Sequence, residues 1–200
     1  MKIIVIGGTG TIGQAVVKEL KERHQIIVAG QQHGDIQVDI TEPTSIEKMY
    51  KSAGHIDAVV ATTGKVKFAD FSTITADDYY IGLNNKLMGQ VNLVLIGLSY
   101  INEGGSFTLT SGILNHDPIA TATSASMVNG ALEGFVISAA IEMPKHLRIN
   151  LVSPTVITES MPKYAPYFRG FESVSVAQVA LAYSKSIEGK QTGKIYKVGY

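Results

Sequence analysis

Three glycines near the start of the chain are spaced to hold a phosphate group. The stretch IVIGGTGTIGQAVV puts Gly7, Gly10 and Gly13 between a β-branched run and an amphipathic segment. In this pattern the first glycine makes a tight turn, the second lets backbone approach a pyrophosphate, and the third lets a helix pack closely on a strand. The helix that follows would direct free N–H groups and its positive dipole end at the phosphates.

The strand before this turn and the helix after it favour dinucleotide binding. A bare glycine pattern is weaker, because it also occurs in structural turns of other α/β proteins. The coenzyme-binding residues expected from the turn are Gly7, Thr9, Gly10, Thr11, Ile12 and Gly13.

The end of the second predicted strand, Gly30-Gln31-Gln32-His33, contains neither an acid nor an arginine. A carboxylate there would bind the ribose hydroxyls of NAD, and an arginine would pair with the 2′-phosphate of NADP. Because no acid repels that phosphate, the sequence slightly favours NADP over NAD, with Gln31 at the ribose. Asp39 would accept the adenine amino group, or would instead precede a helix that starts at Thr41.

Short β-branched runs alternate with helix-length segments along the chain. Most of these runs are apolar on both faces, as expected of parallel strands covered by helices on each side. The alternation predicts a single α/β domain over residues 1–200, a doubly wound parallel sheet of seven strands with a Rossmann fold. The predicted strands are residues 2–6, 26–29, 36–38, 56–60, 106–110, 148–152 and 194–198.

Two capping pairs mark predicted helix starts, Thr75 with Asp78 and Ser175 with Gln178. Only GQQHGD separates the second strand from the third, so the usual crossover helix is missing there. The expected long helices cover 76–101, 121–141 and Ser175 to about Glu188, and the proline-rich segment 154–174 is expected to form an irregular flap.

The composition excludes several classes of protein. The 17 basic and 17 acidic residues form no single-sign block, which argues against nucleic-acid grooves and anionic membrane surfaces. Cysteine is absent, which excludes disulfides and thiolate metal sites, and no metal is expected. KIIVI is too short for a signal-peptide core, and VNLVLIGLSYI falls short of the ~18 apolar residues of a membrane span. We expect a soluble, cytoplasmic protein.

Four stretches in order along the chain resemble the short-chain dehydrogenase/reductase family. They are the GxxGxxG turn, DAVVATTG at the place of an Asn-Asn-Ala-Gly stretch, TLTSG at the catalytic serine, and NGALEGFVISAAIEMPKHLRINLVSPTVITES. The resemblance covers nearly all 200 residues. It implies an NAD(P)(H) coenzyme, and dimers or tetramers joined through the two long helices.

The resemblance keeps only one of the family's four catalytic side chains in place. Ser111 holds the serine position that polarises a substrate carbonyl, whereas Ala125 stands at the tyrosine position. Asn129 stands at the lysine position, and Lys86 at that of the asparagine that orders a relay water. The further coenzyme contacts that the resemblance implies are Thr62, Gly64, Asn129, Pro154 and Thr158, the last at the nicotinamide carboxamide.

The missing tyrosine and lysine raise the question of the proton donor. The methyl group of Ala125 cannot transfer a proton, and general acid catalysis is typically worth roughly 10²–10⁴-fold. We hypothesise that Lys86 supplies the proton, since desolvation lowers a lysine pKa enough for acid–base work. The alternative is that Lys86 is a solvated charge on a helix surface.

Other polar residues have simpler interpretations. His116 follows Ser111 by five residues, but no acid is expected to orient it, and NHDP predicts a turn. Tyr164 or Tyr167 on the flap would replace the missing phenol or serve only as a lid.

Two functions therefore remain open from the sequence. The first is an NAD(P)(H)-dependent oxidoreductase acting on a small-molecule carbonyl or alcohol, which the retention of Ser111 and Thr158 favours. The second is a non-catalytic protein that senses or carries a dinucleotide, which the Ala125 and Asn129 pair favours.

Overall fold

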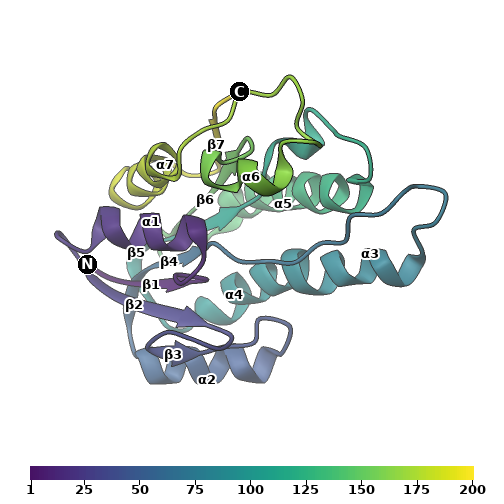
Figure 1. Ribbon diagram of the computed structural model, residues 1–200. Helices are drawn as coiled ribbons and strands as arrows, with labels where there is room; N and C mark the ends of the chain where they lie inside the picture. The colour runs from purple at the N-terminus through teal and green to yellow at the C-terminus, as the bar shows by residue number, and fades with distance from the viewer.

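The seven predicted strands form one parallel sheet in the computed structural model, which describes residues 1–200. The strand order is β3-β2-β1-β4-β5-β6-β7, so the chain leaves the centre of the sheet in both directions from β1 and β4 (Figure 1). This confirms the doubly wound fold, whose ligands bind outside the carboxyl ends of the strands where the order reverses. The strands are β1 (Lys2–Ile6), β2 (Gln25–Gly30), β3 (Ile36–Gln37), β4 (Ile56–Ala61), β5 (Ile101–Thr110), β6 (Arg148–Pro154) and β7 (Ile195–Val198).

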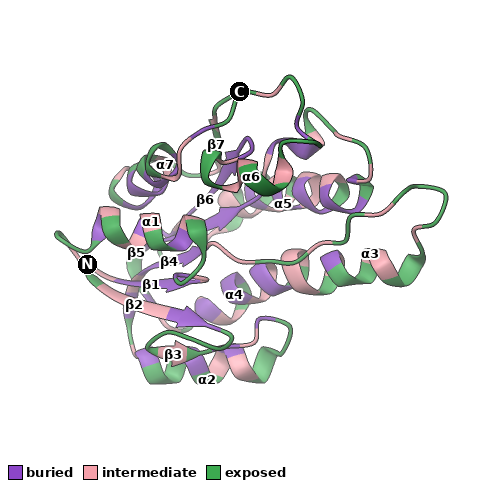
Figure 2. Cartoon of the chain, viewed as in Figure 1, coloured by how far each residue is buried: buried purple, intermediate pink, exposed green.

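Helices cover both faces of the sheet, because successive side chains of each strand point to opposite sides. Ile3 and Val5 of β1 pack in one core cluster with α1 (Thr11–Leu20) and α7 (Val176–Glu188). Ile4 and Ile6 pack in the other cluster, with α2 (Pro43–Ala53), α4 (Gly89–Gly97) and α5 (Thr123–Glu142). Figure 1 shows α1 beside α7 on one side of the sheet, with α2 and α4 on the other. Buried residues gather on the sheet and on the helix sides that face it (Figure 2).

The long helix predicted over 76–101 is shorter and contains an irregular turn. It consists of α3 (Ala76–Gly82), a π-helical turn (Leu83–Met88) and α4, and it ends at Gly97. The capping box of Thr75 and Asp78 is present as predicted, and so is that of Ser175 and Gln178 before α7.

Strand β5 starts five residues before its predicted boundary of 106. The stretch INEGGS has the composition of a turn, yet Ile101 already pairs with Ile56 of β4. A register shift follows in this ladder, and Gly104 has a φ of +73°. The bulge explains how two adjacent glycines fit within a strand.

The connection between β2 and β3 confirms the missing crossover helix. The chain turns back along β2, where Asp35 N–H donates to the Val28 carbonyl and Val28 N–H donates to the Asp35 carboxylate, both at 2.8 Å. Gly34 has a φ of +130°, and an added Cβ would lie 2.7 Å from Val28 O. The chain thus passes from β2 to β3 through a short turn instead of a helix.

The predicted flap contains two short helical turns, Thr158–Ser160 and α6 (Met161–Tyr164). It is fastened at its base by a bridge between Ile157 and Val174. Helix α5 is long and apolar enough by length and composition to cross a membrane, with a mean hydropathy of 1.3. Val128, Leu132 and Val136 of α5 lie in the core, so packing on the sheet accounts for this apolar character.

A buried amide joins α4 to the carboxyl ends of the central strands. Gln90 Nε2 donates to the Thr110 carbonyl at 2.9 Å, and Thr110 N–H donates to Gln90 Oε1 at 2.8 Å. Thr110 Oγ1 donates to the Ala61 carbonyl at the end of β4. Together these bonds fix the end of β5 immediately before Ser111.

Replacing Gln90 by methionine should destabilise the protein, because it removes two hydrogen bonds in a fully buried environment. Each buried polar group left unpaired costs about 1–3 kcal/mol, so the free energy of unfolding should fall by roughly 2 kcal/mol or more. Urea denaturation measures this change. The control is Gln25→Met at an exposed position, which should shift stability by less than about 0.5 kcal/mol. Equal values for the two variants would contradict the structural role of Gln90.

Candidate active site

Two cavities lie side by side at the carboxyl ends of the strands. The first, here the polar cavity, has a volume of about 330 Å³ and lies between β1, β2 and β4. The second, here the apolar cavity, has a volume of about 200 Å³ and is covered by the flap. The predicted residues that line the polar cavity are Gly7, Thr9, Gly10, Gln31, Asp39, Thr62 and Gly64, and those that line the apolar cavity are Ile12, Lys86, Ser111, Asn129 and Pro154.

The glycine turn has the geometry that its spacing predicts. Gly7 has a φ of +81°, and its carbonyl accepts the Gly10 N–H at 2.9 Å. A Cβ on Gly13 would lie only 2.1 Å from Gly7 O, so the start of α1 touches the turn. Gly10 caps α1 without a side-chain hydrogen bond, and the first bond to that cap runs from Gln14 N–H to Gly10 O. The N–H groups at the start of α1 therefore suit an anion at the mouth of the polar cavity.

The adenosine side of the polar cavity is held by Asp39. Its Oδ1 accepts from the Thr41 N–H at 2.9 Å and from the Thr41 hydroxyl at 2.7 Å, and its Oδ2 accepts from Gln31 Nε2 at 3.2 Å. These hydrogen bonds, above all those from Thr41, lower the pKa of Asp39 below its usual range. Asp39 therefore binds Thr41, in agreement with its second interpretation as a residue that precedes a helix. The helix starts at Pro43, however, and not at Thr41.

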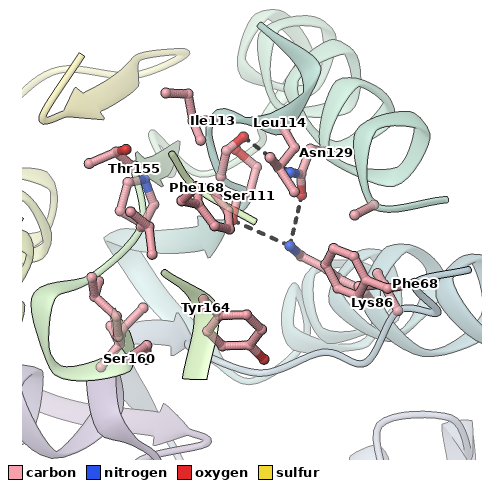
Figure 3. Close-up of a pocket in the computed structure, with 17 residues that line it drawn as sticks. Phe68, Lys86, Ser111, Ile113, Leu114, Asn129, Thr155, Ser160, Tyr164 and Phe168 are labelled. Carbon is pink, nitrogen blue, oxygen red and sulfur yellow. Dashed lines mark hydrogen bonds between the residues drawn. The ribbon is translucent and has the colours of Figure 1, made fainter. Parts of the chain in front are cut away.

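Lys86 lies on the π-helical turn and extends into the apolar cavity. Its Nζ donates to Asn129 Oδ1 at 2.7 Å and to the Ser111 carbonyl at 3.3 Å (Figure 3). The alternative of a solvated surface charge is therefore wrong. A π turn offsets the helical register, and such turns are frequent at functional sites.

Gly64 provides the surface on which the Lys86 stem rests. Gly64 has a φ of +141°, and a Cβ there would lie 2.5 Å from Lys86 Cγ and 2.8 Å from Lys86 Cβ. Next to it, Lys65 N–H donates to Asn85 Oδ1 at 2.7 Å, which ties this loop to the π turn. A side chain at position 64 would displace Lys86.

Asn129 is oriented by a second hydrogen bond. Its Nδ2 donates to the Gly112 carbonyl at 3.1 Å, which leaves Oδ1 to accept from Lys86. Asn129 is 2% exposed and, with Ala125, lies on the cavity-facing side of α5.

Ser111 is buried at the end of β5, and its Oγ has no hydrogen-bond partner. Burying a hydroxyl without a hydrogen-bond partner destabilises the folded protein, so Ser111 Oγ is suited to bind a polar atom of a ligand. Ser111 Oγ and Lys86 Nζ thus belong to the same cavity, whose other walls are mainly apolar side chains such as Phe68, Leu114 and Phe168.

Burial sets the protonation behaviour of Lys86. Its enclosed ammonium loses hydration, which lowers the pKa of Lys86 from 10.5 to about 8. No Asp or Glu lines the apolar cavity, so no carboxylate offsets this loss. Lys86 is consequently protonated at neutral pH yet able to release a proton.

The structure corrects the prediction for His116 and distinguishes the two flap tyrosines. Glu133 does orient His116, since both carboxylate oxygens lie 2.9 Å from His116 Nε2. Glu133 is one helical turn after Asn129, a spacing that puts both on one side of α5 and was available from the sequence. Tyr164 lines the apolar cavity, but Tyr167 faces a neighbouring groove.

Two expected coenzyme contacts lie outside both cavities. Thr158 Oγ1 donates to Ser173 Oγ at 3.0 Å, and Thr11 borders a separate groove between α1 and α7. The residues that sequence reasoning missed are apolar wall residues, such as Phe68 and Ile113, which carried no chemical signal.

Comparison with known proteins identifies the family. A family model described as enoyl-(acyl carrier protein) reductase matches residues 8–189, which is most of the chain. The protein belongs to the short-chain dehydrogenase/reductase family. Members of this family are oxidoreductases, in agreement with the first of the two functions left open by the sequence.

Curated relatives within this family are distant. Hydroxynaphthalene reductase arp2 of Aspergillus fumigatus is 24% identical over 208 residues, which cover 90% of this chain and 76% of that protein. Short-chain dehydrogenase/reductase prx4 of Penicillium roqueforti is 25% identical over 139 residues, which cover 64% of this chain and 42% of that protein. The match to prx4 thus spans less than half of its length.

Solved structures agree with the family fold. The protein lin1944 from Listeria innocua is 48% identical, with a TM-score of 0.98 and 99% of each chain covered. A small-chain dehydrogenase in complex with NADPH is 25% identical, with a TM-score of 0.89, and the match covers 99% of this chain and 96% of that one.

Replacing Gly64 by alanine should move Lys86 away from Asn129, because the new Cβ would overlap Lys86 Cγ. The pKa of Lys86 should then rise from about 8 towards 10.5, which NMR titration of the lysine Cε–H signals measures. Gly104→Ala is a matched control, since Gly104 also has a positive φ, +73°, but nothing lies within 4 Å of its added Cβ. Both variants should lose stability, and only the first should change the titration. An unchanged Lys86 titration in Gly64→Ala would refute this role of Gly64.

Proposed function

We propose that the protein is an NAD(P)H-dependent reductase of small-molecule carbonyl compounds in which Lys86 takes the place of the family's tyrosine as proton donor. The observation that supports this most is the position of Lys86 Nζ in one cavity with the unpartnered Ser111 Oγ. The reverse oxidation of an alcohol uses the same groups.

The residues present fit a nicotinamide dinucleotide. The glycine turn and the uncapped start of α1 suit the pyrophosphate, while Gln31 and Asp39 line the adenosine side. The bound coenzyme would supply a hydride at its nicotinamide ring. Ile12 links the two cavities along the chain, since it lines the apolar cavity and stands in the first turn of α1, two residues after Gly10 of the polar cavity.

The chain's own groups would act on the substrate oxygen. Ser111 Oγ would donate a hydrogen bond to the carbonyl oxygen, which satisfies its missing partner. Lys86 Nζ would donate a proton to the same oxygen, and Asn129 would hold the ammonium in position. The mainly aromatic and aliphatic walls lower the local polarity around these groups, which strengthens their electrostatic interactions.

NADP is the coenzyme that we favour over NAD. The residues directly after β2, from Gln31 to His33, include no carboxylate of the kind that binds the ribose hydroxyls of NAD and repels a 2′-phosphate. The NADPH complex of the 25% identical small-chain dehydrogenase supports the same choice.

A homodimer or homotetramer is also part of the proposal. The outer sides of α4 and α5 expose Leu95, Ile137 and Ile141, which are 55%, 52% and 85% exposed. Leu95 lines a groove between these two helices, and apolar side chains on such a surface suit burial against a second copy.

The rival function is a dinucleotide-binding protein without a redox step. Ala125 and Asn129 at the tyrosine and lysine positions support it, because neither side chain transfers a proton. The buried Lys86 supports catalysis instead, since desolvated titratable groups in a cavity are typical of catalytic acids and bases.

Replacing Lys86 by methionine should lower turnover by roughly 10²–10⁴-fold, as expected for loss of a general acid, while NADPH binding persists. The measurement is NADPH oxidation with a panel of aldehydes and ketones, alongside a thermal shift with each dinucleotide. Lys163→Met is the control, because Lys163 lies over the Tyr164 ring and does not line the cavity.

Undiminished turnover in Lys86→Met would exclude Lys86 as the proton donor. Binding of dinucleotides without NADPH oxidation by the unaltered protein, across the whole panel, would favour the rival function.

A further inference from the structure

The apolar cavity contains one positive charge at neutral pH, and no lining carboxylate balances it. Among its 17 lining residues Lys86 is the only cation, and no Asp or Glu is present. The two groups that accept from Lys86 Nζ, Asn129 Oδ1 and the Ser111 carbonyl, are both neutral. The cavity is thus a positive pocket with apolar walls.

Titratable groups on the surrounding elements do not supply the missing negative charge. On the helix of Lys86, Asp78 is held by Thr75 in a capping box, and on α5 Glu133 is held by His116. The phenol of Tyr164 lines the cavity. The other titratable side chains on these elements lie outside it: Lys65, Lys67 and Asp70 on the loop after β4, Asp77, Tyr79 and Tyr80 on α3, Glu142 on α5, Asp117 before it, and Glu159, Lys163, Tyr167, Arg169 and Glu172 on the flap.

The nicotinamide ring carries a different charge in its two redox states. The oxidised ring is a cation, and the reduced ring is neutral. In a cavity of about 200 Å³ an enclosed ammonium and a ring cation are necessarily close. At such separations the repulsion between two unit charges weakens binding by roughly tenfold or more.

We propose that Lys86 makes this site discriminate between the redox states of its coenzyme, binding the reduced form more tightly than the oxidised form. The proposal rests on the nicotinamide end of the coenzyme occupying the apolar cavity, as in the proposed function. Once Lys86 regains the proton that it gives to the substrate, its charge repels the oxidised ring and favours release of the oxidised coenzyme. Where both forms are present, the reduced form then occupies more of the site, which favours carbonyl reduction over alcohol oxidation.

The preference for the reduced coenzyme should depend on pH, because the charge of Lys86 depends on pH. The pKa of Lys86 is about 8, so its ammonium is present below that pH and is lost above it. Affinity for the oxidised form should therefore rise with pH through this range, while affinity for the reduced form stays nearly constant. Oxidised coenzyme should also release a proton from Lys86 on binding, since repulsion lowers the pKa further.

The experiment compares the dissociation constants of NADP⁺ and NADPH by calorimetry at about pH 6.5 and about pH 9.5. The ratio of the two constants cancels other titrations that both forms share, such as that of the 2′-phosphate. In the unaltered protein the ratio should favour NADPH by roughly tenfold or more at the lower pH and approach one at the higher pH.

Three variants assign the effect. Lys86→Met should bind both forms alike at either pH, and Lys86→Arg should keep the preference for NADPH at both. Lys163→Met, a control outside the cavity, should behave as the unaltered protein. Circular dichroism checks that each variant is folded, and the pH dependence of the unaltered protein is itself a test that needs no variant.

A pH-independent ratio near one in the unaltered protein, with turnover intact, would overturn the discrimination and leave the proposed function standing. Failure to bind either form would overturn both. A preference that persists unchanged in Lys86→Met would show that another group is responsible, and would also overturn the proposal.

Discussion

An ammonium group enclosed beside apolar walls, with only neutral oxygens as partners, is the constraint on which the site depends. Burying a charge is unfavourable, so Lys86 keeps its place only because Asn129, Ser111 and Gly64 define it from three directions. The same enclosure lowers its pKa to about 8. The loss of hydration that lowers this pKa is therefore also the source of the free-energy cost of burying Lys86.

Residues near the ends of β4 and β5 hold Lys86 in this position. Gly64 follows β4 and supports the Lys86 stem, while Gln90 and Thr110 join α4 to the ends of both strands. Between them, the π turn places Lys86 opposite α5. Lys86 and Asn129 thus bind each other directly, at the positions where the family resemblance implies an asparagine and a lysine.

The sequence predicts the fold better than it predicts the candidate active site, for a physical reason. Glycine spacing and β-branched runs depend on local backbone and burial, so the sheet, the glycine turn and both capping boxes followed from them. INEGG, residues 101–105, was missed as part of β5, because pairing with β4 overrides its turn composition. The His116–Glu133 contact, the walls of the apolar cavity and the enclosure of Lys86 arise from residues distant in the chain, and periodicity alone does not report such contacts.

The central claim is that the glycine turn and the Lys86 cavity are two ends of one coenzyme site. A crystal structure of the protein with saturating NADPH tests it most directly. The account predicts the pyrophosphate at the N-terminus of α1 and the nicotinamide ring in the apolar cavity, in contact with Lys86 or Ser111. A coenzyme whose nicotinamide lies outside this cavity, or an empty glycine turn, would contradict it.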